Sequence, residues 1–129
     1  MLKQKAIIDG IPIMLNKVET SDEYREGARA SGNTLSSNEG YMFQYDTAMK
    51  LQFENTGVPY DLRVLYLLNM IDTEDVQQGV VMESVDMNKN SAKIVFPMYG
   101  VYTVAVELRK DFCDTNKIGK GSIITLKDA

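Results

Sequence analysis

Histidine and tryptophan are both missing from the 129 residues, and there is a single cysteine, Cys113. The absence of histidine removes the usual general base near neutral pH, every Ser–His or Cys–His catalytic pair and most zinc and iron sites. Any catalysis would have to use carboxylates, lysine, tyrosine or an oxygen-liganded Ca²⁺ or Mg²⁺ ion. One cysteine allows no internal disulfide. Because Asp111 and Asp114 disfavour its thiolate, Cys113 is interpreted as a small, half-buried residue and not as a nucleophile.

Long apolar runs and concentrated positive charge are also lacking. No run approaches the ~20 residues of a membrane-spanning helix, and Lys3 and Lys5 are not followed by an apolar core of signal-peptide length. We therefore expect a soluble, cytoplasmic protein without a membrane partner, or a virion component if the chain is phage-encoded. The 14 basic residues are scattered and the net charge is −4, whereas nucleic-acid binding needs a concentrated basic face. Nucleic acid is not expected as a partner.

Length and pattern indicate one mainly β domain over residues 1–129 with one or two short helices. Asp9-Gly10 separates two apolar segments and suits a type I′ hairpin turn, and Pro12 should restrict its strand to an edge or to pairing on one side. A capping-box pattern from Thr20 to Glu23 predicts a short helix that ends at about Ala28 or Ala30. Further strands are expected at 41–45, 51–53, 61–68, 79–82, 93–96, 102–108 and 122–126, and a helical turn at 110–117. The strand at 61–68 is apolar on both faces and should be central. Seven or eight short strands with frequent turns predict a compact closed or partly open β-barrel.

A polar turn with a fixed-φ proline precedes the longest apolar strand. It reads Asn55-Thr56-Gly57-Val58-Pro59-Tyr60-Asp61. In one interpretation Asn55, Thr56 and Asp61 form a small polar site in which Asp61 is a base or ligand. In the other, Asn55 and Thr56 hydrogen-bond the turn backbone and Asp61 anchors loop amides. The residue types alone leave both open.

Glu39 and Glu107 are two further carboxylates that adjoin apolar strands. An inward-facing Glu107 would need a partner, such as Arg109, Arg63 or a second carboxylate, because a buried carboxylate is costly. A pair of carboxylates could do acid–base chemistry, whereas an outward Glu107 would simply be solvated. The segment Asp86–Asn90 starts like a calcium loop but has Ser91 and Pro97 where glycine and glutamate are required. No metal site and no cofactor are predicted.

These motifs together resemble the domain of unknown function 192 family. Glu39-Gly40-Tyr41-Met42-Phe43 matches its Gly-Met-Leu-Phe-like strand, and the segment 55–61 matches its Asn-Thr…Ile-Pro-Leu-Asp motif. Val106-Glu107-Leu108 and Ile118-Gly119-Lys120-Gly121 match its C-terminal part. A basic position of the family is acidic here, at Glu54. The resemblance covers residues 7–126 and implies a small closed β-barrel without an established reaction.

Three functions remain open at this point. The first is a non-catalytic binding module in which Glu39, Asn55, Thr56, Asp61 and Glu107 line a polar barrel mouth for a small polar ligand or a protein partner. The second is a structural subunit of a larger assembly, such as a phage particle or a homo-oligomer. The third is a hydrolase or lyase that uses Asp61 with Glu39 or Glu107, which predicts a raised carboxyl pKa in a cleft.

Overall fold

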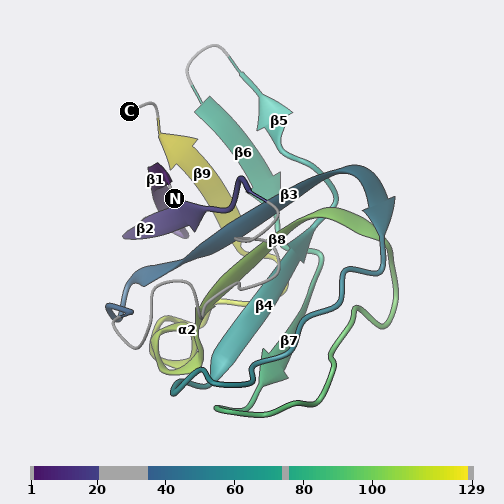
Figure 1. Cartoon of the computed structure of the whole chain (residues 1–129). Coiled ribbons are helices and arrows are strands. Elements are labelled where there is room, and N and C mark those ends of the chain that lie inside the picture. Colours follow the sequence, from purple (N-terminus) through teal and green to yellow (C-terminus); the bar gives the residue numbers. More distant parts are fainter. Residues whose placement is uncertain (1, 21–34, 74–75, 128–129) are drawn as a thin grey trace.

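The computed structural model describes residues 2–20, 35–73 and 76–127, and the strands of this part form one nine-stranded mixed sheet (Figure 1). The strand order is β5-β6-β9-β1-β2-β3-β8-β4-β7. The β2–β3 pair is parallel and the other neighbouring pairs are antiparallel. The strands are β1 Leu2–Ile8, β2 Ile11–Lys17, β3 Glu39–Met49, β4 Leu62–Leu67, β5 Ile71–Asp72, β6 Val76–Val80, β7 Glu83–Met87, β8 Tyr102–Arg109 and β9 Ile123–Lys127. One short helix, α2 Lys110–Asn116, follows β8 directly.

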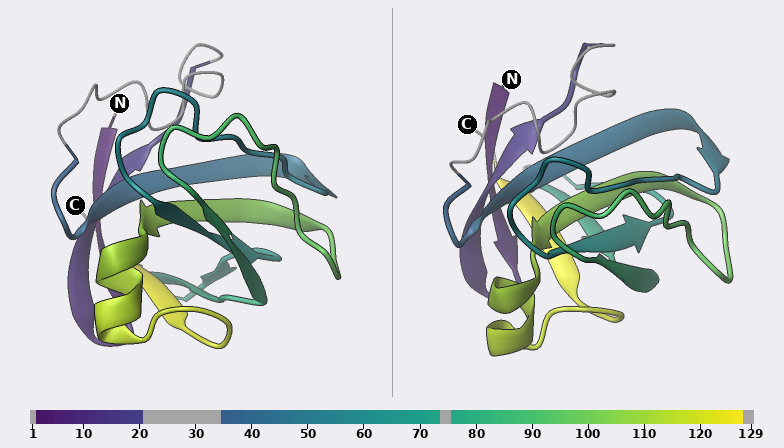
Figure 2. Two further views of the ribbon diagram at one scale, coloured as in Figure 1. Left: turned by 90° about the horizontal axis from the view of Figure 1, so that it is seen from below. Right: turned by 60° about the horizontal axis from the view of Figure 1, so that its bottom comes forward.

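The mainly β class is confirmed, but the sheet is not closed into a barrel. Closure would require the last strand to pair with the first, and β5 and β7 are instead the two open edges. Strand β5 has only two residues and offers little backbone for such pairing. The sheet bends strongly, so that β1, β2 and β9 run across the direction of β3, β8 and β4 (Figure 2). The closed form of the predicted barrel is therefore wrong, and among the described residues the sheet has nine strands where seven or eight were expected.

The predicted hairpin at Asp9-Gly10 joins β1 to β2. Both turn residues have positive φ, 49° for Asp9 and 83° for Gly10, as a type I′ turn requires. Pro12 pairs with Ile7 of β1, and the pairing of β2 with β3 begins only at Met14. The expectation that Pro12 pairs on one side is confirmed, because its missing N–H faces no second strand.

Several predicted elements differ from the observed ones. The segments 51–53 and 93–96 are not strands and share one isolated bridge, between Phe53 and Val95. The predicted strand 79–82 is divided, since β6 ends at Val80 and β7 begins at Glu83. The predicted helix after Thr20 falls almost entirely outside the described residues, whereas the helical turn at 110–117 and the strands at 102–108 and 122–126 are confirmed.

Two apolar cores lie on the two faces of β3, β8 and β4. The first fills the bend of the sheet, where Leu65 and Val106 meet Leu15 and Ile124. The second lies on the opposite face and is covered by loops, with these buried members: Val18, Leu35, Tyr41, Phe43, Leu51, Val58, Leu62, Val64, Tyr66, Met87, Val95, Tyr102 and Ala105. Full burial of each large apolar side chain contributes about 1.5–3 kcal/mol. The apolar residues at 51–53 and 93–96 thus cover a core as loops. Strand β4, apolar on both faces, is paired on both sides, but it lies next to the edge strand β7 and not at the centre of the sheet as predicted.

The register of β4 against β8 positions the polar residues at the end of this second core. Leu62 pairs with Arg109. Since the strands are antiparallel, the chain that enters β4 lies beside the chain that leaves β8. This brings Asp61 next to Lys110, 49 residues further along the chain.

Candidate functional site

A polar pocket of about 310 Å³ opens where β4 begins and β8 ends. Three separate segments line it: the turn before β4, the turn after β7, and the junction of β8 with α2. The lining residues are Pro59, Tyr60, Asp61, Lys89, Arg109, Lys110, Asp111 and Asp114. Three carboxylates and three cations therefore share one hollow with a tyrosine ring.

Asp61 ties the three segments together. Its carboxylate Oδ1 accepts a hydrogen bond from the backbone N–H of Lys89 at 2.7 Å. Its backbone carbonyl accepts one from the N–H of Lys110 at 2.9 Å. Among the described residues Asp61 Oδ2 has no hydrogen-bond partner, so one oxygen of this exposed carboxylate is free for a ligand.

Arg109 forms one wall of the pocket and is held from three directions. Its guanidinium carbon lies 4.3 Å from the ring centroid of Tyr60, a cation–π contact. Nε and Nη2 donate to the two oxygens of Asp111 at 3.2 and 2.9 Å, and Nη1 donates to the carbonyl of Leu35 at 3.2 Å. The hydrogen bonds from Arg109 hold the pKa of Asp111 below its ordinary value. The positive charge of Arg109 is thus already largely compensated within the chain.

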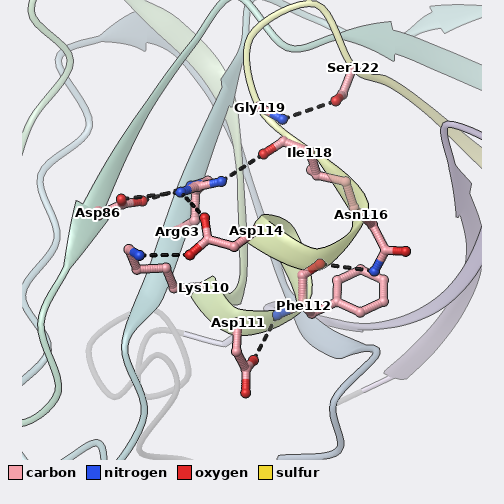
Figure 3. Close-up of polar contacts among 10 residues, drawn as sticks. All are labelled: Arg63, Asp86, Lys110, Asp111, Phe112, Asp114, Asn116, Ile118, Gly119 and Ser122. Atoms are coloured by element: carbon pink, nitrogen blue, oxygen red, sulfur yellow. Dashed lines mark hydrogen bonds and ion pairs between the residues drawn. The ribbon is translucent and has the colours of Figure 1, made fainter.

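An ion-pair network forms the side of the pocket next to α2 (Figure 3). Lys110 Nζ lies 2.7 Å from Asp114 Oδ2, and Arg63 Nη2 lies 2.8 Å from Asp114 Oδ1. Arg63 also contacts both oxygens of Asp86, at 2.7 and 3.2 Å, and donates to the carbonyl of Ile118 at 2.9 Å. The hydrogen bonds from Lys110 and Arg63 lower the pKa of Asp114. The network fixes α2 against β4 and β7.

Lys89 is the remaining cation of the pocket. Its side chain makes no hydrogen bond or ion pair with any other part of the chain that the structure describes. Lys89 and Asp61 therefore present an ammonium group and a carboxylate oxygen to the pocket, both available to a ligand.

Asn55 holds the turn by side-chain hydrogen bonds, and neither Asn55 nor Thr56 lines the pocket. Asn55 is 1% exposed, and its Nδ2 donates to the carbonyls of Tyr60 at 2.8 Å and Asn88 at 3.1 Å. Its Oδ1 is buried and without a hydrogen-bond partner among the described residues. Thr56 is half-buried beside Gly57, whose φ is 79°. Asn55 hydrogen-bonds the turn backbone, as the second interpretation of the polar turn expected. Asp61 fits both interpretations, because it anchors a loop amide and also faces the pocket.

Glu39 lies at the start of β3, away from the pocket lining. Its carboxylate accepts hydrogen bonds from Asn16 at 2.9 Å, from Lys3 at 3.2 Å and from the backbone N–H of Ser36 at 3.2 Å. Burial alone would raise the pKa of Glu39, but these hydrogen bonds together hold it below its ordinary value. The carboxylate of Glu39 therefore has hydrogen-bond donors within the chain, and its role is to hold the start of β3 in place.

Glu107 points into the second core. Its backbone pairs with Tyr41 of β3 and Val64 of β4, so its side chain shares their apolar face. The side chain is buried, and Oε1 has no hydrogen-bond partner among the described residues. Burial raises the pKa of Glu107 to about 8, so the carboxyl is mainly protonated at neutral pH. The inward orientation is the one that required a partner, yet neither Arg109 nor Arg63 reaches it by a hydrogen bond or ion pair.

The five residues predicted for one barrel mouth are therefore not gathered in one place. Asp61 alone lines the pocket, and the turn of Asn55 and Thr56 supports it. The sequence reasoning missed Lys89, Lys110 and Asp111 as pocket residues. Their signal was available in principle: Arg109-Lys110-Asp111 ends one apolar strand, and Asp61 begins another. Only the pairing of these strands shows that they meet.

Two further observations concern metals and the single cysteine. Within the described ranges, no group of three or more His, Cys, Asp or Glu side chains is placed to hold a metal ion. Cys113 is fully buried in the first core instead of half-buried, and burial raises the pKa of its thiol to about 12. It is therefore a poor nucleophile, as predicted.

No helix of the described residues has the length and apolar character needed to cross a bilayer.

Comparison with known proteins shows two solved structures with a similar fold. No protein-family model and no curated protein sequence matches the chain. A solved structure from Sinorhizobium meliloti 1021, described as a "putative transcription regulator", has a TM-score of 0.76 and 8% identity, and the match covers 95% of this chain and 92% of that one. A protein of unknown function from Novosphingobium aromaticivorans DSM 12444 has a TM-score of 0.70 and 13% identity, covering 95% of this chain and 83% of that one. At these identities the likeness establishes a shared fold and no function.

Proposed function

We propose that the chain is a non-catalytic binding domain whose pocket beside α2 takes a small polar ligand bearing both a positive and a negative group. One observation carries the proposal: Asp61 Oδ2 and the Lys89 ammonium face the same 310 Å³ pocket with no partner among the described residues. The other pocket charges are paired within the chain, Arg109 with Asp111 and Lys110 with Asp114. The free carboxylate would hold the ligand's cation, and the free ammonium its anion. A free amino acid has this chemistry.

The pocket is also suited to binding by its rigidity. Asp61 is fixed by the N–H of Lys89, and Arg109 is fixed over Tyr60 by the hydrogen bonds to Asp111 and to Leu35. Groups that are already ordered lose little conformational entropy when a ligand binds. The half-buried ring of Tyr60 supplies an apolar wall for the ligand's carbon atoms.

The hydrolase or lyase alternative receives less support. It required a raised carboxyl pKa in a cleft. Among the described residues the carboxyl with a raised pKa is Glu107, which does not line the pocket. Its side chain is buried in the second core, where a substrate could not reach it without displacing the loops that cover that core. The separation of Glu107 from Asp61 favours binding over acid–base catalysis.

We also propose membership of the domain of unknown function 192 family. The matched segments 39–43, 55–61 and 106–108 fall on β3, on the turn that enters β4, and on β8. These three strands are neighbours in the sheet. Three of the four matched segments are thus neighbours in the fold, and the fourth, 118–121, lies between α2 and β9.

The binding proposal is tested by calorimetric titration with single amino acids, each compared with its carboxamide and its N-acetyl derivative. The complete amino acid should bind, and both derivatives should bind at least tenfold more weakly because each lacks one charge. Asp61→Asn retains an acceptor for the Lys89 N–H but loses the charge, and Lys89→Gln removes the ammonium. Each variant should weaken binding about tenfold, whereas Lys93→Gln, an exposed lysine outside the pocket, should not. Absence of binding by every amino acid, or equal binding of the derivatives, would overturn the proposal.

A further inference from the structure

A hollow of about 280 Å³ lies on β1 and β2 and shares no lining residue with the polar pocket. Ala6 and Ile13 of these strands are buried in the first core. Because successive side chains of a strand point to opposite faces of the sheet, the outer face carries their neighbours Ile7, Pro12 and Met14. These three side chains line the hollow and are half-buried or exposed. The hollow therefore has an apolar floor that is open to solvent.

Two lysines, Lys5 and Lys127, also line the hollow and lie side by side. Ala6 of β1 pairs with Leu126 of the neighbouring strand β9 (Figure 1), and the antiparallel register places Lys5 opposite Lys127. The side chain of Gln4 ties the two residues together, because its Nε2 donates hydrogen bonds to both of their backbone carbonyls. Both lysines are exposed, and neither ammonium group has a hydrogen-bond or ion-pair partner in the part of the chain that the structure describes.

The positive charge of the hollow is not compensated by the chain. Among the described residues no Asp or Glu lines it, although acidic residues outnumber basic ones by 18 to 14 in the whole sequence. Glu39 pairs with Met14 in the sheet, but its carboxylate is held by Lys3 and Asn16. Like charges that face each other across a strand pair destabilise a sheet. Two unpartnered lysines in this position are therefore a cost to the fold, of the kind that proteins keep at functional sites.

We propose that the hollow binds a small amphipathic carboxylic acid, with the carboxylate between Lys5 and Lys127 and the hydrocarbon chain over the apolar floor. A purely polar anion would leave the floor uncovered, and a neutral apolar molecule would leave the two lysines uncompensated. Hydrogen bonds from an ammonium group to a carboxylate are stronger than those between neutral groups. Ligand pockets commonly measure about 300–1,000 Å³, so the hollow suits a ligand at the small end of this range, such as octanoate.

This site differs in charge from the pocket beside α2. That pocket presents both a free carboxylate oxygen, on Asp61, and a free ammonium group, on Lys89. The hollow on β1 and β2 presents ammonium groups together with an apolar floor. The two sites therefore take different ligands, and binding at the hollow does not depend on the function proposed for the pocket.

The test is an NMR titration of the isotope-labelled full chain with octanoate, followed through the backbone amide resonances. Octanoate should bind saturably and shift the resonances of β1, β2 and β9. 1-Octanol has no charge and should bind about tenfold more weakly, because it loses two exposed ion pairs that contribute up to about fivefold each. Butanoate should also bind at least about tenfold more weakly, because it lacks four CH₂ groups that contribute up to about fourfold each when buried.

Replacement of the lysines tests the charges of the hollow. Lys5→Gln and Lys127→Gln should each raise the Kd for octanoate about threefold, and the double variant about tenfold. Lys120→Gln, which changes an exposed lysine outside the hollow, should leave the Kd unchanged. The midpoint of urea unfolding separates binding from folding: in the single variants it should stay the same or rise, because a repulsion between like charges is removed.

Replacement of a floor residue tests the apolar contact. Ile7→Thr retains a branched side chain suited to a strand but is more polar, and it should weaken binding of octanoate more than binding of butanoate. Ile94→Thr, which changes an isoleucine of 54% exposure outside the hollow, should affect neither. The proposal would be overturned by the absence of saturable octanoate binding, by equal binding of 1-octanol, or by shifts centred outside β1, β2 and β9. A lower unfolding midpoint in both lysine variants would also overturn it, since the lysines would then serve the fold.

Discussion

The Tyr102 hydroxyl donates a hydrogen bond of 2.6 Å to Oε1 of Glu83, the carboxylate that also accepts hydrogen bonds from the backbone N–H groups of residues 98–100. The ring of Tyr102 in turn stacks on Tyr66, with centroids 5.5 Å apart. The hydrogen bond contributes to raising the pKa of Tyr102 to about 12, although burial is the larger cause. One carboxylate thereby connects an exposed loop to the second apolar core.

Replacement of this carboxylate should loosen the loop at residues 98–100. Burial alone would raise the pKa of Glu83, but the hydrogen bonds from Tyr102 and the three amides outweigh it and hold the pKa below its ordinary value of 4.5. The carboxylate therefore stabilises the fold above pH ~4.5, and this contribution is lost as the pH falls through the lower folded-state pKa. Glu83→Gln keeps one acceptor and should cost about 1–3 kcal/mol at pH 7.

The cost is measured by urea denaturation, and amide hydrogen exchange at Met98, Tyr99 and Gly100 should accelerate in the same variant. Asp46→Asn, an exposed carboxylate-to-amide change in β3, serves as the control and should leave both quantities unchanged. Unaltered exchange at the three amides in Glu83→Gln would mean that the loop is ordered by other contacts.

Gly40 is required by the close approach of β3 to β8. A Cβ atom built on Gly40 would lie 2.1 Å from the backbone carbonyl oxygen of Glu107 and 2.6 Å from a methyl carbon of Leu108. Backbone cannot move aside as a flexible side chain can, so Gly40→Ala should destabilise the domain by about 1–3 kcal/mol. The measurement is the midpoint of urea unfolding.

Gly119 provides the matched control for this substitution. A Cβ atom there would meet only Ser84 Oγ, at 3.9 Å. Gly119→Ala should therefore change the midpoint much less than Gly40→Ala. Equal effects of the two substitutions would show that loss of glycine, and not the contact with Glu107, causes the destabilisation.

How far the sequence predicts this structure depends on whether a feature is local. The Asp9-Gly10 turn, β8 and α2 follow from patterns within a few residues, and they are observed where they were expected. The segments 51–53 and 93–96 have the composition of strands, but they lie over Tyr66 and Phe43 as loops because that core face needs an apolar cover. Composition cannot distinguish a strand in the sheet from an apolar loop that covers it.

The candidate site was predicted least well because it is assembled from distant segments. Asp61 could be selected from its own turn, but Lys89 and Lys110 join it only through the pairing of β4 with β7 and β8. Strand alternation left both an inward and an outward, solvated Glu107 open, and the structure shows the inward one. The missing partner could not be foreseen, since a protonated carboxyl needs less compensation than a carboxylate.

Glu107 should make the stability of the domain depend on pH in the opposite direction to Glu83. Its pKa is about 8 in the folded chain, against an ordinary value of 4.5. Between these values the folded state holds a proton that the unfolded state has released, so the free energy of unfolding falls as the pH rises. The fall is at most about 1.4 kcal/mol per pH unit. It ends above pH ~8, where both states are ionised.

Glu107→Gln removes this titration while keeping a similar shape. The variant should lose the decline of unfolding free energy between about pH 5 and 8, and it should be more stable than the parent chain at pH 9, where the parent must bury a charge next to Tyr41 and Val64. Urea denaturation at pH 5, 7 and 9 measures both effects, with Asp46→Asn as the exposed control. If the parent and Glu107→Gln show the same pH dependence, Glu107 stays ionised in the folded chain. Its Oε1 then has a compensating partner in solution, and the apolar environment inferred for it is wrong.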